Sequence, residues 1–198
     1  MIISTCFSVW RRVPAAAALL VLTFARGSAA AVPAERLIVA SGGFVDGGTI
    51  PDVYAYRGCA PHAENRSPQI AWRGSVAGTK SYTVTLFDPD APTGHGFWHW
   101  VLFNVPPTVH EIPAGGGAPR SPALPRGAIL GRSDFGTAGY GGPCPPQGDR
   151  PHHYVFTVRA LDMRALPGRT QATTGPELLK AVSGHVLAEG KLIGRFGR

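Results

Sequence analysis

Three side chains that could bind a ligand or exchange protons lie close together in the stretch Ser81–Pro107, SYTVTLFDPDAPTGHGFWHWVLFNVPP. Asp88 and Asp90 follow an alternating run of apolar and polar residues, and His99 lies in the next apolar run. An ionised carboxylate only accepts hydrogen bonds, whereas an imidazole can donate and accept them. The proline-stiffened turn between the two runs would bring all three side chains to one end of a sheet. We therefore expect a functional site there.

A second stretch, Gly141–Phe156, looks like the partner of the first. It reads GGPCPPQGDRPHHYVF, a proline-rich loop that leads into another strand-like run. Side chains alternate across a strand, so His152 and Tyr154 share one face and His153 takes the other. We add His152 and Tyr154 to the candidate site and interpret His153 as structural. The remaining histidines have no such partner and are interpreted as surface or structural residues: His62, His95, His110 and His185.

Strands must position these side chains, and the alternation predicts them directly. Tyr82, Val84 and Leu86 fall on one face of a run that must end at the prolines after Asp88, because proline cannot donate to a sheet ladder. The strongest strand predictions share β-branched and aromatic residues at period two, and they cover residues 81–87, 98–105 and 152–161. Weaker apolar segments predict two short strands within residues 37–56, a fragment at 67–72 and a last strand at 191–196.

One late segment has the pattern of a helix. Thr174 is placed as the N-cap, Pro176 follows early, and Glu177 comes three residues after the cap. Residues 106–151 are rich in Gly and Pro, and we expect an ordered loop anchored by its apolar residues. Many short strands with Gly/Pro turns predict a mainly β fold, an antiparallel β-sandwich or barrel with an appended C-terminal helix.

The first 30 residues have the pattern of a secretory signal peptide. Arg11 and Arg12 form a positive region, an apolar stretch follows from Val13 to Ala25, and small residues surround Ala30. The prediction is cleavage of residues 1–30, a single domain over residues 31–198, and a periplasmic or secreted protein. The alternative is an uncleaved membrane anchor. No other stretch is long and apolar enough to predict a membrane span in the mature chain.

Charge and cysteine content narrow the possible functions and the cellular compartment. Without the leader's three arginines, 16 basic residues face 12 acidic ones, and the basic residues are spread singly. This pattern does not favour nucleic-acid binding. The mature chain keeps Cys59 and Cys144, which could form a disulfide in an oxidising compartment. The alternative is two free, partly buried thiols.

The two motifs together, D-P-D-A-P with a downstream W-H and G-P-x-P-P-x-G with H-x-Y, resemble the phosphatidylethanolamine-binding protein (PEBP) family. The resemblance is to the bacterial Raf-kinase-inhibitor-like (YbhB/YbcL-type) branch. It extends to Asn65–Pro68, to Ser133–Gly136 and to Gly184–His185, and so covers about Leu37 to Phe196. It implies two antiparallel sheets with C-terminal helical elements.

The same resemblance implies roles for the candidate residues. Asp88 would form the base of an anion pocket and His99 one wall. Asp88 is expected to orient a histidine or the turn, or to donate a hydrogen bond when protonated at low pH. The pocket would be completed by the backbone around Gly142 and Pro143 and by His152 and Tyr154. The remaining positions would support the pocket. Asp90 lies near the turn, and Pro92 matches a proline that is cis in the family. Trp98 and Trp100 would be apolar walls or simply part of the core.

Imidazole and phenol groups donate hydrogen bonds to phosphate oxygens, more strongly when the histidine is charged. The function predicted is an exported, non-catalytic binding protein for a small phosphate-type head group. The alternatives are a protease or kinase inhibitor that acts through the pocket rim and, third, a weak hydrolase.

Catalysis, cofactors and metals are not favoured. The chain has no G-x-S-x-G elbow, and Asp88 and Asp90 are too close in one turn to flank a sugar. A zinc site could use His99, His152 and Asp88, but the sequence does not favour one, because the chain has no C-x-x-C pair.

Overall fold

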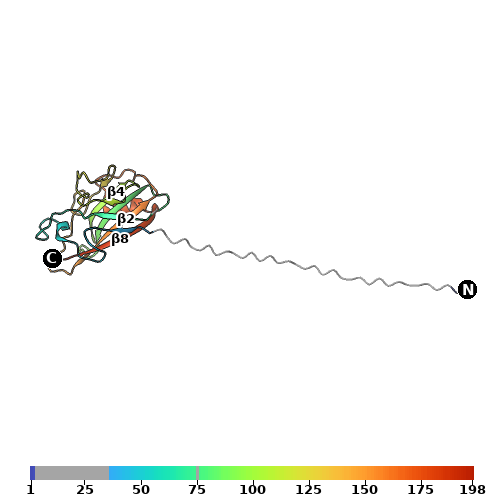
Figure 1. The fold of residues 1–198 in the computed structure, drawn as a ribbon, viewed down its shortest axis with the longest axis horizontal. Helices are drawn as coiled ribbons and strands as arrows, with labels where there is room; N and C mark the ends of the chain where they lie inside the picture. Colours follow the sequence, from blue (N-terminus) through green and yellow to red (C-terminus); the bar gives the residue numbers. More distant parts are fainter. Residues whose placement is uncertain (3–35, 75) are drawn as a thin grey trace. The chain divides into compact units, whose positions relative to one another are not determined.

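The computed structural model describes residues 1–2, 36–74 and 76–198, so the signal-peptide prediction lies outside the described residues. Over these residues the chain forms two antiparallel sheets (Figure 1). The three-stranded sheet has the order β1 (Ile38–Ala40), β2 (Ile70–Arg73) and β5 (Glu111–Ile112). The five-stranded sheet has the order β6 (Ile129–Leu130), β4 (Phe97–Val105), β3 (Ser81–Asp88), β7 (His152–Leu161) and β8 (Val186–Phe196).

Two hydrophobic clusters cover the two faces of the larger sheet. The inner cluster joins both sheets: it includes Trp72 from β2, Val84 and Leu86 from β3 and Phe156 from β7. The outer cluster lies under α1 (Gly175–Val182) and contains Val101, Phe103, Leu178 and Val182. Because both faces are covered, β3 is buried along almost its whole length, including its polar residues.

The helix prediction is confirmed, whereas one of the weaker strand predictions is not. Thr174 and Glu177 form the capping box that the sequence predicted, with the N–H of Thr174 donating to Glu177 at 2.9 Å. In residues 37–56 the prediction of two strands was wrong in part. Only β1 forms there, and a short 3-10 helix, η1 (Asp52–Tyr54), takes the place of the second strand.

The three strong strand predictions are confirmed in position, within one residue at the ends. The last strand begins at Val186, earlier than predicted, and it continues through Gly190. A side chain at Gly190 would collide with the carbonyl of Leu37, so a glycine lets the N-terminal segment approach β8 closely.

A β-bulge in β4 determines where its aromatic residues point. Leu86 pairs with Trp100 and Phe87 with Trp98, so His99 is an extra residue with no partner on β3. The bulge turns His99 and Trp100 toward the inner face, while Trp98 packs on the outer cluster. No helix in the described part of the chain is both long and apolar enough to cross a bilayer.

Candidate functional site

A small cavity lies at the end of the larger sheet where β3 stops and β4 and β7 begin, and we call it the sheet-end pocket. It has a volume of about 240 Å³. It brings together Asp88, Pro92, His99 and His152 of the predicted site. The other lining residues are Ala91, Thr93, Phe97, Phe135, Cys144, Pro145 and Pro146.

Asp88 is the buried organiser at the base of the pocket. One carboxylate oxygen accepts the N–H of Asp90 at 2.9 Å, and the other accepts from Nδ1 of His152 at 2.8 Å. Only 2% of Asp88 is exposed, so both bonds form where water cannot replace them. The carboxylate therefore holds the turn after β3 and orients the first histidine of β7.

His152 has a carboxylate near each ring nitrogen. Nδ1 donates to Asp88, and Nε2 lies 3.4 Å from an oxygen of Asp149, which is half exposed three residues earlier. The proline-rich loop before β7 thus places a second acid beside this ring. Asp149 was not among the residues predicted for the site.

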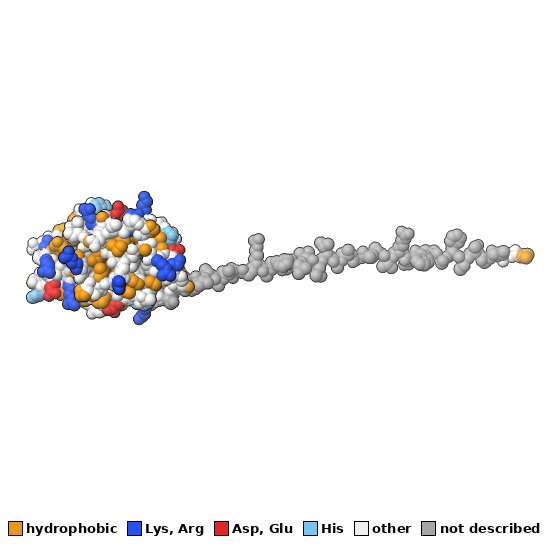
Figure 2. Space-filling view, turned by 90° about the horizontal axis from the view of Figure 1, so that it is seen from above, with side chains coloured by type: hydrophobic (Ala, Val, Ile, Leu, Met, Phe, Trp, Pro, Cys, Tyr) orange, Lys and Arg blue, Asp and Glu red, His pale blue; other side chains and the backbone are white. Residues whose placement is uncertain are grey.

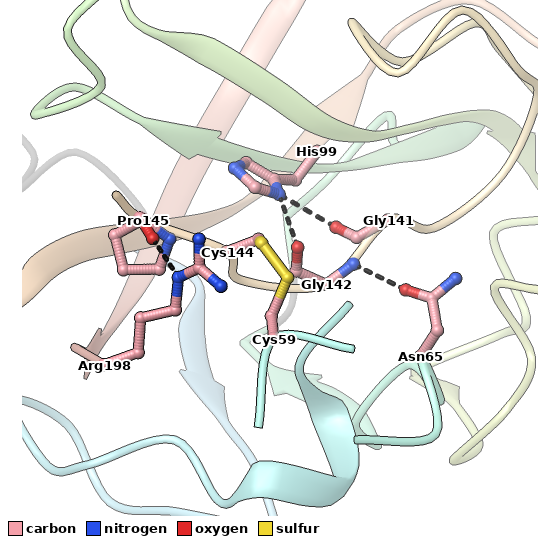
Figure 3. Close-up of a disulfide and its surroundings, with 8 residues drawn as sticks. All are labelled: Cys59, Asn65, His99, Gly141, Gly142, Cys144, Pro145 and Arg198. Atoms are coloured by element: carbon pink, nitrogen blue, oxygen red, sulfur yellow. Dashed lines mark hydrogen bonds between the residues drawn. A yellow bond between two sulfur atoms is a disulfide. The ribbon is translucent and has the colours of Figure 1, made fainter. Parts of the chain in front are cut away.

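His99 is held from behind by two carbonyl groups. Its Nδ1 lies 2.9 Å from the carbonyl oxygen of Gly141 and 3.1 Å from that of Gly142 (Figure 3). Both partners can only accept, so Nδ1 must carry the hydrogen. Burial lowers the pKa of His99, and these carbonyls and the charge of Asp88 offset that only in part. In the neutral ring Nε2 therefore keeps a lone pair.

Gly142 and Pro143 are not among the lining residues of the pocket: Gly142 holds His99, and Pro143 bonds to the segment after η1. The N–H of Gly142 donates to Asn65 at 2.7 Å (Figure 3), and the carbonyl of Pro143 accepts from Tyr56 at 3.0 Å. A side chain at Gly142 would collide with the backbone of residues 54–56, so this position needs glycine. The backbone groups expected to face a ligand are thus used inside the fold.

Cys59 and Cys144 form a disulfide behind the same loop, with Cα atoms 5.4 Å apart (Figure 3). Cys144 also lines the pocket. The bond ties the pocket wall to the loop after η1. Next to it, Nε of Arg198 donates to the carbonyl of Pro145 at 2.6 Å.

Tyr154 lies behind the pocket, not in its lining. Its ring meets His99 edge-to-face at 5.2 Å, and the residue is fully buried. Burial and then the negative charge of Asp88 raise the pKa of Tyr154 well above its ordinary value, so the phenol stays neutral. Its hydroxyl makes no hydrogen bond of good geometry within the described chain.

The apolar walls are Phe97 and Phe135, not the predicted Trp98 and Trp100. The two phenyl rings meet edge-to-face at 4.9 Å and both contact the His99 ring. The bulge at His99 reverses the strand phase, which sends Trp98 to the outer cluster and Trp100 to the inner core. The wall prediction was therefore wrong, and the alternative of plain core holds for Trp100.

Phe135 reaches the pocket because its loop runs along the edge of β4. The N–H of Asp134 donates to the carbonyl of Trp98 at 2.8 Å, and the Asp134 side chain accepts the N–H of Trp98 at 2.8 Å. The stretch Ser133–Gly136 is part of the family resemblance noted in the sequence. Nothing in the stretch itself indicated that Asp134 would pair with Trp98.

Asp90 and His153 form a second pair on the outer side of the turn. Asp90 accepts from the backbone N–H of His153 at 2.8 Å and from its ring at 2.7 Å, and Arg150 lies at 3.2 Å. Burial acts to raise the pKa of Asp90, but these hydrogen bonds and charges together hold it below its ordinary value. His153 points away from the pocket, where strand alternation placed it.

The cis peptide bond expected at Pro92 is absent, because no cis bond occurs in the described chain. The reversal between β3 and β4 is spread over several residues, and Gly94 and Gly96 adopt positive φ of 81° and 75°. Glycine tolerates that conformation, so the chain turns without a cis bond. Pro92 lines the pocket as a trans proline.

Within the described residues, no group of three or more His, Cys, Asp or Glu is arranged to hold a metal ion. Lys and Arg side chains are scattered over the face seen in Figure 2 rather than gathered in one patch.

Comparison with known proteins gives a consistent assignment. Residues 40–197 match the family model described as phosphatidylethanolamine-binding protein. The UPF0098 protein YbcL of Escherichia coli is 50% identical over 119 residues, 60% of this chain and 64% of that relative, so the match spans less than two thirds of its length. The UPF0098 protein of Methanothermobacter thermautotrophicus is 40% identical over 158 residues, which cover 78% of this chain and 95% of that relative.

Solved structures agree with the sequence relatives. The crystal structure of E. coli YbcL, described as a member of the mammalian PEBP family, superposes with a TM-score of 0.77 at 37% identity, over 82% of this chain and 99% of that one. A PEBP homolog from Chlamydia trachomatis gives a TM-score of 0.69 at 28% identity, over 82% and 98%. The chain therefore belongs to the phosphatidylethanolamine-binding protein family, in its bacterial YbhB/YbcL-type branch.

Proposed function

We propose that this protein is an exported, non-catalytic binding protein that holds a phosphate-type head group in the sheet-end pocket. The observation that carries the proposal is that the imidazole rings of His99 and His152, from β4 and β7, line one cavity with Asp88 at its base. Buried histidines beside an orienting carboxylate are suited to hydrogen bonding with phosphate oxygens and hydroxyls. Membership of a family named for phosphatidylethanolamine binding supports the same ligand class.

The shape of the pocket fits a small head group with a short apolar continuation. At about 240 Å³ it is smaller than the usual drug-sized ligand cavity. Phe97, Phe135, Pro145 and Pro146 form its apolar part. A phosphate group would sit against the histidines while an attached carbon chain packs against these rings.

The lining offers no free hydroxyl or thiol as a nucleophile, which supports binding rather than catalysis. The hydroxyl of Thr93 donates to the carbonyl of Gly96 at 2.7 Å, and the sulfur of Cys144 is in the disulfide. A hydrolase needs a nucleophile or an activated water beside a base. A protein partner at the pocket rim remains an outcome that binding assays against proteases and kinases would reveal.

Export is supported by two independent features of the chain. Residues 1–30 have the charge and hydropathy pattern of a cleaved leader. The Cys59–Cys144 disulfide is of a kind that persists in the periplasm or outside the cell. We therefore place the mature protein in one of those compartments.

Titration of the mature protein with methyl phosphate, followed by two-dimensional NMR, tests the binding proposal. His99→Ala and His152→Ala should each weaken binding about ten- to a hundred-fold, the effect of losing one polar contact in a buried site. His153→Ala is the matched control, because that ring faces away from the pocket and pairs with Asp90. Binding unchanged in both pocket variants, or lost only in the control, would refute the proposal.

A further inference from the structure

A second cavity lies beside β6, and we call it the arginine pocket. Its volume is about 590 Å³, within the range of cavities that hold small organic ligands. Three segments of the chain line it: residues 119–130, residue 138 and residues 169–171. It shares no lining residue with the sheet-end pocket, so a ligand bound here would be held by other side chains.

Two arginines give the arginine pocket its charge. Arg120 and Arg169 line it, and no aspartate or glutamate among the described residues does. Neither guanidinium makes a hydrogen bond or a salt bridge within the part of the chain that the structure describes. The charge of Arg169 acts on the carboxylate of Glu177, but that carboxylate already accepts the N–H and the hydroxyl of Thr174. The pocket therefore holds two cations that no carboxylate of its lining balances.

Arg169 has a polar atom whose hydrogen-bonding capacity the described chain leaves unused. Its Nε is shielded from solvent and has no hydrogen-bond partner among the described residues. A buried donor on a cation that lacks a partner raises the free energy of the folded state. An anion bound beside this guanidinium would offset that cost electrostatically, so the site is better satisfied when it is occupied.

The loops hold both arginines at the cavity. Arg120 has a φ of 61°, a conformation that residues with a side chain adopt rarely, and a backbone hydrogen bond of 3.1 Å across residues 118–121 closes its turn. Next to Arg169, the N–H of Thr170 donates to the hydroxyl of Thr173 at 3.1 Å. The backbone, not contacts between side chains, therefore sets where the two cations enter the pocket.

The rest of the lining is mostly apolar and adds one free donor. The hydroxyl of Thr170 accepts the N–H of Ala172 at 3.2 Å and keeps its own hydrogen for another acceptor. The apolar residues, which we call the apolar floor, are Pro119, Leu124, Ala128, Ile129, Leu130 and Ala138. A ligand that matches this lining needs an anionic head for the arginines and an apolar chain for the floor.

We propose that the arginine pocket binds an amphiphilic carboxylate of the fatty-acid type. A planar guanidinium can pair with both oxygens of a carboxylate at once, so Arg120 and Arg169 suit this head group. The chain would leave water by packing on the apolar floor. This site is separate from the sheet-end pocket, and it does not depend on the proposed function.

Titration of the mature protein with octanoate at neutral pH, followed by two-dimensional NMR, tests the proposal. The amide signals of residues 119–130, 138 and 169–171 should shift and saturate, and those of His99 and His152 should stay in place. Methyl phosphate should not displace octanoate. If it does, or if the shifts gather around the two histidines, octanoate occupies the sheet-end pocket and the proposal is wrong.

Two matched compounds separate the head from the chain. Octanamide has the chain of octanoate without its charge, and acetate has the carboxylate without the long chain. Each should bind about ten-fold or more weakly than octanoate, because one loses the charge-assisted hydrogen bonds and the other loses the buried methylenes. Octanamide that binds as tightly as octanoate would refute the role of the arginines, and acetate that does so would refute the role of the apolar floor.

Variants of single arginines complete the test. Arg120→Gln and Arg169→Gln each remove one charge, and each should weaken octanoate binding about ten-fold. Arg126→Gln is the matched control, because Arg126 is an exposed arginine of the same loop that does not line the pocket, and its affinity should equal that of wild type. Arg120 is also exposed, so its variant keeps the test decisive if Arg169→Gln does not fold. Unchanged octanoate binding in Arg120→Gln, or an equal loss in Arg126→Gln, would overturn the proposal.

Discussion

The carboxylate of Asp88 and Nδ1 of His152 lie 2.8 Å apart across the ends of β3 and β7. Two residues after Asp88, Asp90 repeats the relation with the next histidine of β7, His153, at 2.7 Å. The two acids therefore hold two consecutive histidines that point to opposite faces. The inner pair sets the base of the pocket, and the outer pair fastens the turn beside it.

Asp88→Asn should damage both stability and binding. The amide can accept one of the two hydrogen bonds made by Asp88, but it places an N–H against the other donor. For a residue this buried we expect a loss of about 1.5–3 kcal/mol in the free energy of unfolding, measured by urea denaturation. Methyl phosphate binding should weaken with it. Asp90→Asn is the control in the same turn, and its affinity should stay near wild type.

Asp90 should make the fold sensitive to strong acid. The pKa of Asp90 is lower in the folded chain than the ordinary 3.8. Its stabilisation is therefore complete above about pH 4 and is lost as the pH falls through the folded pKa. Urea denaturation from pH 5 to pH 2 should show a shallower loss of stability for Asp90→Asn than for wild type. If both proteins lost stability equally as the pH falls, Asp90 would not be the group responsible.

The parts of the site that could be predicted are those governed by local pattern. Alternation placed His152 and Tyr154 on one face of β7, and the prolines after Asp88 marked the end of β3. The bulge at His99 has no local signal, because it arises from pairing with β3, so the prediction of Trp98 and Trp100 as pocket walls was wrong. The walls that replace them depend on contacts between distant segments, which a single sequence does not reveal.

The Cys59–Cys144 disulfide should contribute strongly to stability. The two cysteines are 85 residues apart, and closing a loop of that length is worth roughly 4 kcal/mol in the chain-entropy model. Cys59→Ser should lower the free energy of unfolding by that order and leave one alkylatable thiol. Two alkylatable thiols in unreduced, natively exported wild-type protein would rule the bridge out.

The mass of the exported protein shows whether the leader is cleaved. The apolar stretch and the small residues around Ala30 predict cleavage after that residue, within one or two positions. Intact-mass spectrometry of protein recovered from the periplasm or medium should find a chain that begins near Ala31. A species in the membrane fraction that still begins at Met1 would support the membrane-anchor alternative instead.

His99 should cause a second, milder loss of stability on acidification, at a higher pH than the loss caused by Asp90. Burial lowers its folded pKa below the ordinary 6.5, so below that pH the unfolded chain binds a proton that the folded chain does not. The free energy of unfolding should therefore be full above about pH 6.5 and fall with decreasing pH, by at most about 1.4 kcal/mol per pH unit.

His99→Asn should remove this slope between pH 6.5 and the folded pKa, whatever its effect on stability at pH 8. His62→Ala changes an exposed histidine and should keep the wild-type slope. A wild-type slope that survives in His99→Asn would mean that another buried group binds the proton. In that case neutral His99, and with it the lone pair at the floor of the pocket, would lose its support.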